Sequence, residues 1–260
     1  MNNTCKILVL SDVDKSTRGV LKNGINLAKM LNGEIDFFCV KKPTDIVEKE
    51  SQLSAMRSIN ENFIKADNTI KKLIKDLSAN EKIPIRHKIS FGNLKDEISD
   101  HLKDIKPDIV VLGKRKSTIL SFMGDNIIDF VLKEYAGTTM IVSEKNPLEA
   151  TTKISLGLLN DANSLKNRFA EKLVSYTNKP LKSFQINTKS SIENKTSTAE
   201  KTIDFIFEEG DHVFKNMGNY LSKNNINLLF VNRENEKIKS SKSRISNLAN
   251  NLDCSLMLTN

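Results

Sequence analysis

The chain of 260 residues is long enough for one large domain or two ordinary ones, and its 38% hydrophobic and 28% charged residues are typical of globular proteins. The net charge is +8, but lysines and acidic residues are interleaved rather than gathered in a basic stripe, so we expect no nucleic-acid partner. Residues 1–10 lack a signal-peptide pattern and no apolar run reaches the length of a membrane span, which predicts a cytoplasmic protein without a membrane partner.

Strand-like and helix-like patterns alternate through the first half. In chain order, we expect a strand at 6–10, a helix at 16–31, a strand at 35–40, a long helix at 47–79, a strand at 85–90, a helix from 93 or 95 to 102, a strand at 109–112, a helix after Gly124 and a strand at 138–142. Strands that are joined by helical crossovers pair in parallel, so the fold class is α/β with a doubly wound parallel sheet.

After a linker at 144–152, the second half repeats this order in reduced form. We expect strands at 153–159, 181–186, 203–207, 227–231 and 254–258, with helices at about 162–176 and 245–252. The stretch at 187–202 is too short for a counterpart of the long helix and is predicted to be a loop or mobile segment. The expected domains are therefore 1–145 and 153–260.

The region from 110 to 142 has the pattern of a phosphate-binding loop. Gly113 follows one predicted strand, a basic loop comes next, and Gly124 precedes a helix for which Asp125 is a good N-cap. Backbone N–H groups and the helix dipole favour an anion at such a helix start. The second half has Asn232 and Arg233, then a polar run, where the first half has its glycines, so we expect no glycine-dependent cradle there.

Four segments, in this order, resemble the universal stress protein family. They are ILVLSD (7–12), ISFGN (89–93), IKPDIVVLG (105–113) and GDNIIDFVLKEYAGTTMIV (124–142). The resemblance covers nearly all of the first half, whereas the second half matches only in the order of its elements. It implies the tandem form of the family, with two Rossmann-like domains of the adenine nucleotide alpha hydrolase type that form a pseudo-dimer. Domain 1–145 would have a partly degenerate nucleotide motif, and domain 153–260 would be degenerate.

The resemblance also implies where a nucleotide would bind. Nucleotide-binding members use an aspartate after strand one, a backbone amide after strand two and a glycine motif after strand four. The matching positions, with the cation that follows the first glycine, are Asp12, Val40, Gly113, Lys114, Lys116, Gly124 and Asp125.

Two departures from the family pattern oppose each other. Lys116 replaces the second glycine, and Asp125 replaces the serine or threonine whose hydroxyl would contact a phosphate. A carboxylate at a helix start caps the free N–H groups itself and repels an anion. The cations at 114–116 would attract one. The sequence alone therefore does not decide whether the first half binds ATP.

The sequence is compatible with two functions. The first is a non-catalytic stress-response protein that acts through contacts with an unidentified protein partner. Its halves would pair through the strands at 138–142 and 254–258, and a homodimer is a further assembly to consider. The alternative is an ATP-binding and slowly hydrolysing switch in the first half. An unrelated enzyme on this scaffold, such as an adenylyl-transfer domain, has no supporting motif in the sequence.

Other polar and sulfur-containing residues have structural interpretations. Asp12 could accept a hydrogen bond from a ribose or adenine group, but either Asp12 or Asp14 could cap the following helix instead. The three cysteines are isolated and predict buried, reduced thiols. The three histidines have no partner at metal-ligand spacing, so no metal is expected. The lysines of the long helix predict a solvated face.

Overall fold

The computed structural model describes residues 4–42, 52–79, 81–114, 127–143, 146–149, 153–160, 168–177, 180–187, 202–210, 212–233 and 245–259. The first half forms β1 (Cys5–Leu10), α1 (Thr17–Leu31), β2 (Gly33–Lys41), α2 (Gln52–Ser78), β3 (Ile85–Phe91), α3 (Leu94–Ile105), β4 (Ile109–Gly113), α4 (Ile127–Glu134) and β5 (Thr138–Val142). Every predicted element of this half is present, with ends that differ by a few residues. Residues 47–51 of the predicted long helix lie outside the described residues.

The second half forms β6 (Leu156–Leu159), α5 (Arg168–Ser175), β7 (Leu181–Asn187), β8 (Thr202–Glu208), α6 (Val213–Lys223), β9 (Leu228–Asn232), α8 (Ile245–Asn251) and β10 (Ser255–Thr259). The predicted strands and both predicted helices are present. Helix α6 was not expected, although Val213, Met217 and Leu221 recur at helical spacing and are its buried residues. Of the predicted loop at 187–202, Asn187 ends β7 and Thr202 begins β8, and residues 188–201 lie outside the described residues, as does most of the predicted linker.

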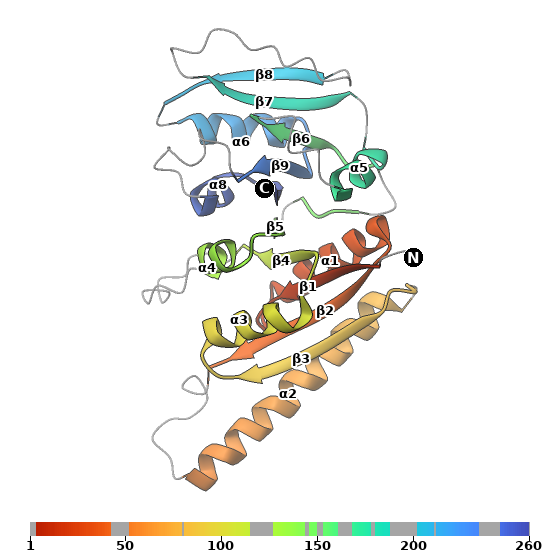
Figure 1. Cartoon of the computed structure of the whole chain (residues 1–260), viewed down its shortest axis with the longest axis vertical. Helices are drawn as coiled ribbons and strands as arrows, with labels where there is room; N and C mark the ends of the chain where they lie inside the picture. Colours follow the sequence, from red (N-terminus) through yellow and green to blue (C-terminus); the bar gives the residue numbers. More distant parts are fainter. Residues whose placement is uncertain are drawn as a thin grey trace.

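All ten strands belong to one sheet, in the order β3-β2-β1-β4-β5-β10-β9-β6-β7-β8 (Figure 1). The second five strands repeat the order of the first five in reverse. Every neighbouring pair is parallel except β5 and β10, which pair antiparallel at the centre, with Ile141 opposite Leu256 and Thr139 opposite Leu258. This pairing confirms the expected pseudo-dimer of two doubly wound parallel sheets.

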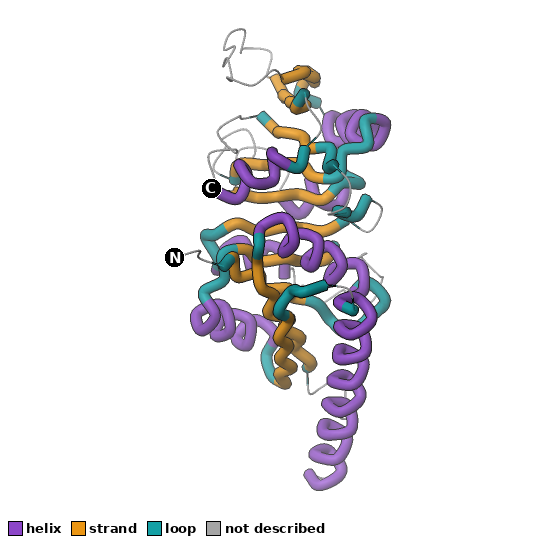
Figure 2. Tube along the Cα trace, turned by 90° about the vertical axis from the view of Figure 1, so that its right-hand side faces the viewer, coloured by secondary structure: helices purple, strands orange, loops and turns teal. Residues whose placement is uncertain are grey.

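Helices cover both faces of the sheet (Figure 2). Because side chains alternate along a strand, Ile7 and Val9 of β1 join one core cluster with α1, whereas Leu8 and Leu10 join another with α3. The first of these clusters continues into the second half, where it includes Phe230. The two halves therefore share a hydrophobic core and one sheet. No helix in the described residues is long and apolar enough to span a membrane.

Two buried asparagines of α1 fix the segment that follows β5. Asn23 Oδ1 accepts a hydrogen bond from the backbone N–H of Leu148 (2.7 Å), and Asn26 Nδ2 donates to the Leu148 carbonyl (2.6 Å). Leu148 itself is fully buried in the core that both halves share. Both backbone groups of this buried residue are thus hydrogen-bonded, which removes the cost of burying them unpaired.

A substitution at Ile141 tests how the pairing of β5 with β10 stabilises the chain. This β5 residue is 0% exposed and packs in a core cluster made mainly by the second half. We expect Ile141→Ala to lower the free energy of unfolding by about 2–5 kcal/mol, since it leaves a cavity. Ile206→Ala is the matched control, because Ile206 is a strand residue that is 64% exposed, and it should change stability by less than about 0.5 kcal/mol. Urea denaturation measures both, and equal losses would contradict this role for β5.

Candidate functional site

The carboxyl ends of β1, β2 and β4 meet at one edge of the sheet. Leu10 of β1 is in register with Phe38 of β2 and with Leu112 of β4. Four of the predicted site residues follow this row: Asp12, Val40, Gly113 and Lys114. The strand order reverses direction between β1 and β4, and such a switch point is where open α/β sheets commonly bind ligands. The structure therefore brings these four positions together.

The side chain of Asp14, in the turn after β1, accepts hydrogen bonds from backbone N–H groups at the start of α1. Asp14 Oδ1 accepts hydrogen bonds from the backbone N–H groups of Ser16 (2.8 Å) and Thr17 (3.2 Å). The hydroxyl of Thr17 donates to the carbonyl of Asp12. Burial raises the pKa of Asp14, but the hydrogen bonds from Ser16 and Thr17 outweigh that effect and lower the pKa overall. A carboxylate thus already occupies the position at which the start of α1 would attract an anion.

Gly113 is explained by packing between α1 and the end of β4. A Cβ atom at this position would lie 2.7 Å from Cγ2 of Val20, which is closer than carbon atoms pack. Val20 is a buried α1 residue that is 2% exposed. The glycine therefore has a structural role whether or not a phosphate binds beside it.

Lys114 reaches across the pseudo-dimer. Its Nζ atom donates to the carbonyls of Leu252 and Cys254, the latter at 3.2 Å. These carbonyls lie between the end of α8 and the start of β10, in the second half. A helix end presents unpaired carbonyls and a partial negative charge, so a lysine is well placed there.

Arg233, which directly follows β9, makes the reciprocal contact. Nη1 donates to the carbonyls of Leu132 (3.3 Å) and Tyr135 (3.1 Å), and Nη2 donates to the carbonyl of Gly137. The Leu132 carbonyl belongs to the last turn of α4, and those of Tyr135 and Gly137 lie between α4 and β5, in the first half. Burial lowers the pKa of Arg233, although the Tyr135 side chain opposes this shift. An arginine nevertheless keeps its charge at neutral pH.

The two contacts match position by position, and we call the pair the crossed latch. Lys114 binds the carbonyls of the third and the first residue before β10, which begins at Ser255. Arg233 binds the carbonyls of the third and the first residue before β5, which begins at Thr138. In each half, the residue after the fourth strand thus secures the last helix and strand of the other half.

Four of the seven predicted site residues either differ from the expectation or lie outside the described residues. Val40 lies inside β2 at 7% exposure rather than after the strand. Lys116, Gly124 and Asp125 lie outside the described residues, so their part in a nucleotide site stays a prediction.

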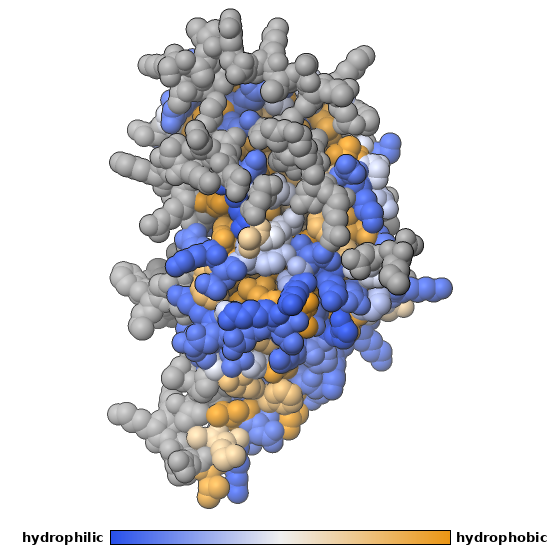
Figure 3. Space-filling model, in the orientation of Figure 1, coloured by the Kyte–Doolittle hydropathy of each residue, from blue (hydrophilic) through white to orange (hydrophobic). Residues whose placement is uncertain are grey.

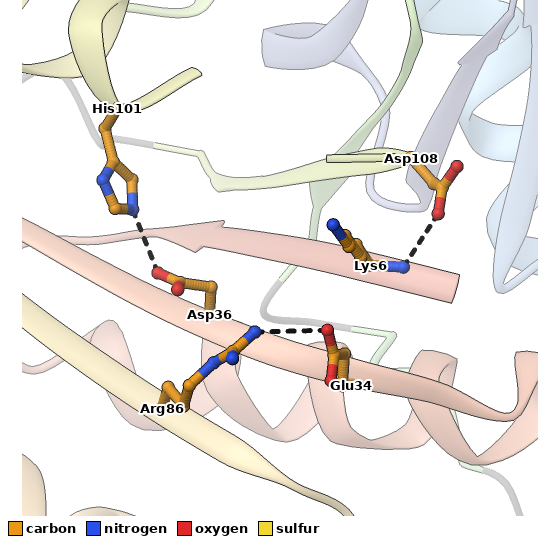
Figure 4. Close-up of polar contacts among 6 residues, drawn as sticks. All are labelled: Lys6, Glu34, Asp36, Arg86, His101 and Asp108. Atoms are coloured by element: carbon orange, nitrogen blue, oxygen red, sulfur yellow. Dashed lines mark hydrogen bonds and ion pairs between the residues drawn. The ribbon is translucent and has the colours of Figure 1, made fainter. Parts of the chain in front are cut away.

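A buried polar pair away from this edge escaped sequence-based reasoning. His101 of α3 is 4% exposed, and its Nε2 atom lies 3.0 Å from Oδ1 of Asp36 in β2 (Figure 4). The imidazole also stacks on Phe38 with ring centroids 3.9 Å apart. Partners 65 residues apart leave no local pattern. Since the pair lies beneath α3, in the middle of β2, we assign it to packing between helix and sheet.

The structure gives no sign of reactive cysteines or of a metal site among the described residues. The three cysteines are buried thiols, as predicted. Burial raises the pKa of Cys39 to about 11 and that of Cys254 to about 12, so both are protonated, unreactive thiols. Across the described residues, no group of three or more His, Cys, Asp or Glu is placed to hold a metal ion. The lysines on α2, by contrast, are exposed as predicted: Lys65, Lys71, Lys72 and Lys75.

Removing one arm of the crossed latch should be costly. We expect Arg233→Ala to lower the free energy of unfolding by about 1.5–3 kcal/mol, because partly buried carbonyls lose charge-assisted hydrogen bonds. Arg86→Ala is the control, since its side chain is 66% exposed and forms a surface ion pair with Glu34, and it should cost less than about 1 kcal/mol. Chemical denaturation measures the free energy of unfolding of both variants. If Arg86→Ala lowers it as much as Arg233→Ala does, the crossed latch does not stabilise the chain as proposed.

The cap at Asp14 should show a pH dependence of defined sign. Its pKa is lower in the folded chain than the ordinary value of 3.8. Its stabilisation is therefore present above that value and is lost as the pH falls through the folded pKa. We expect Asp14→Ala to cost about 1 kcal/mol at about pH 7 and less at about pH 3. Thermal unfolding of both proteins across this range measures the difference, and a constant or widening gap would disprove it.

Comparison with solved structures shows a shared fold over the full chain. A universal stress protein from Archaeoglobus fulgidus DSM 4304 aligns with 99% of this chain and 97% of its own, with a TM-score of 0.71 and 15% identity. A functionally unknown protein from Pseudomonas aeruginosa PAO1 aligns with 99% of this chain and 93% of its own, with a TM-score of 0.55 and 7% identity. A search of curated proteins found no match.

The family is shown by the sequence itself. The family model described as "Universal stress protein family" matches residues 4–143, which is more than half of the chain. This match includes β1 to β5 and the sheet edge at which the predicted site residues meet. The chain therefore belongs to the universal stress protein family.

Proposed function

We propose that this member of the family is a non-catalytic binding protein of the stress response that acts through contacts with other proteins. The observation that carries the proposal is the bond from Lys114 Nζ to the carbonyls of Leu252 and Cys254. A cation that would otherwise face a phosphate at the switch point is used instead to hold the two halves together. Arg233, at the equivalent place in the second half, is used in the same way.

Two further observations support this reading of the site. The start of α1 is already capped by the Asp14 carboxylate, which disfavours a second anion. Gly113 accommodates Val20, so its presence does not require a phosphate. We propose accordingly that 1–145 and 153–260 are two domains fused into a permanent pair. The buried thiols, none of which is in a disulfide, support the cytoplasm as the proposed compartment.

ATP binding in the first half is the competing function. In its favour, Asp12, Gly113 and Lys114 converge at the switch point, where related folds bind nucleotides. Binding would require Lys114 to leave its carbonyl partners or the phosphates to be held without it. Residues 115–126 would then have to supply the remaining contacts.

Isothermal titration of ATP into the purified chain distinguishes the two functions. We expect no heat of binding up to about 1 mM ATP, the concentration that corresponds to a binding free energy of about −4 kcal/mol. Asp125→Ser restores the hydroxyl of the family pattern and is the informative variant. Binding by this variant alone would show that the native loop has lost the function. Binding by the parent chain, abolished by Asp12→Ala, would overturn our proposal and support the nucleotide switch.

A further inference from the structure

Helix α2 is longer than the strand on which it packs. Its second part lies against the sheet, with Ala66 and Ile70 buried. The ring of Phe63 is 6.3 Å from that of Phe91, the last residue of β3. The first eleven residues of the helix, 52–62, therefore extend past the end of β3 by about 16 Å, at 1.5 Å per residue. Figures 1 and 2 show this projection at the lower end of the molecule.

The projecting part of α2 and the two residues that follow it expose large apolar side chains. Leu53 is 75% exposed, Met56 70%, Ile64 50% and Phe63 39%. Figure 3 shows hydrophobic residues at this end of the molecule. A helix surrounded by water gains no stability from exposed apolar side chains. Where several lie close together, they commonly mark an interaction surface.

Met56 and Phe63 continue the stripe of α2 that packs on the sheet, whereas Leu53 and Ile64 lie beside it. Two sets recur every seven residues and are offset by three, as in the a and d positions of a coiled coil: Met56, Phe63, Ile70 and Leu77; and Ile59, Ala66 and Leu73. The C-terminal members pack in the core of the chain. The N-terminal members continue the same seam beyond the end of β3. A seam of this period fits another helix of the same period.

The charges along the projecting part favour a second copy as that helix. Within 52–62, the positions that flank the seam are neutral and include Asn60 and Asn62. Arg57, Glu61 and Lys65 lie at the outer heptad positions. Two copies of this seam can therefore approach each other without like charges in contact, which is what self-association requires.

We propose that the seam at Met56, Ile59 and Phe63 pairs with the same seam of a second chain to form a homodimer. An antiparallel arrangement puts the two sheets at opposite ends of the helix pair and keeps them apart. This interface lies at the opposite end of the first half from the join between β5 and β10. It is independent of whether ATP binds, so the two proposals succeed or fail separately.

Sedimentation equilibrium of the full chain tests the proposal. We expect the mass to rise with concentration from 29.3 kDa toward twice that value. Met56→Lys places a charge in the seam and should raise the dissociation constant at least about tenfold. Asn68→Lys is the matched control, because it adds the same charge at an exposed position off the seam, and it should dimerise as the parent does. Salt between about 0.05 and 0.5 M should have little effect, since the seam is apolar.

A cross-linking experiment tests the arrangement. The native cysteines are buried, so Asn60→Cys would add the reactive thiol. We expect oxidation to yield a disulfide-linked dimer with this variant and much less with Asn68→Cys. The proposal is wrong if the parent chain stays at 29.3 kDa throughout, if Met56→Lys dimerises as strongly as the parent, or if both cysteine variants cross-link equally.

Discussion

The antiparallel pairing of β5 with β10 is the interaction on which the rest of the structure depends. Each five-stranded half would otherwise end in an apolar strand with one unpaired row of backbone groups, which invites aggregation. Pairing the two edges satisfies these groups and lets Ile141 enter the core of the second half. It also brings each fourth strand within reach of the other half's last helix, so the crossed latch exists only because the edges are joined.

The crossed latch changes how the switch point is interpreted. A cation after the fourth strand has two classes of negative partner within reach, a bound phosphate or the carbonyls at the end of a helix. The carbonyls belong to the same chain and are always present, whereas a ligand must be captured from solution. Lys114 and Arg233 both bind carbonyls, so the position after the fourth strand has a structural role in both halves.

The sequence predicts the fold well, because buried strands and amphipathic helices each have a hydrophobic spacing that can be read from neighbouring residues. Helix α6 could have been found in the same way from Val213, Met217 and Leu221. Four of the predicted site positions, Asp12, Val40, Gly113 and Lys114, do converge, but the contacts of Lys114 could not be foreseen. Its acceptors are backbone carbonyls about 140 residues away. Every residue has a carbonyl, so the identities of Leu252 and Cys254 carry no signal of the bond. The pairing of His101 with Asp36 escaped notice because it also spans a long separation.

Fusion of the two halves also removes a requirement of symmetry. In a dimer of identical chains the interface is isologous, so any substitution appears on both sides at once. Here a lysine forms one arm of the latch and an arginine the other. The long helix α2 occurs in the first half, with no counterpart among the described residues of the second. Each half can thus diverge without its partner changing, and one can specialise in holding the pair together while the other carries new surfaces.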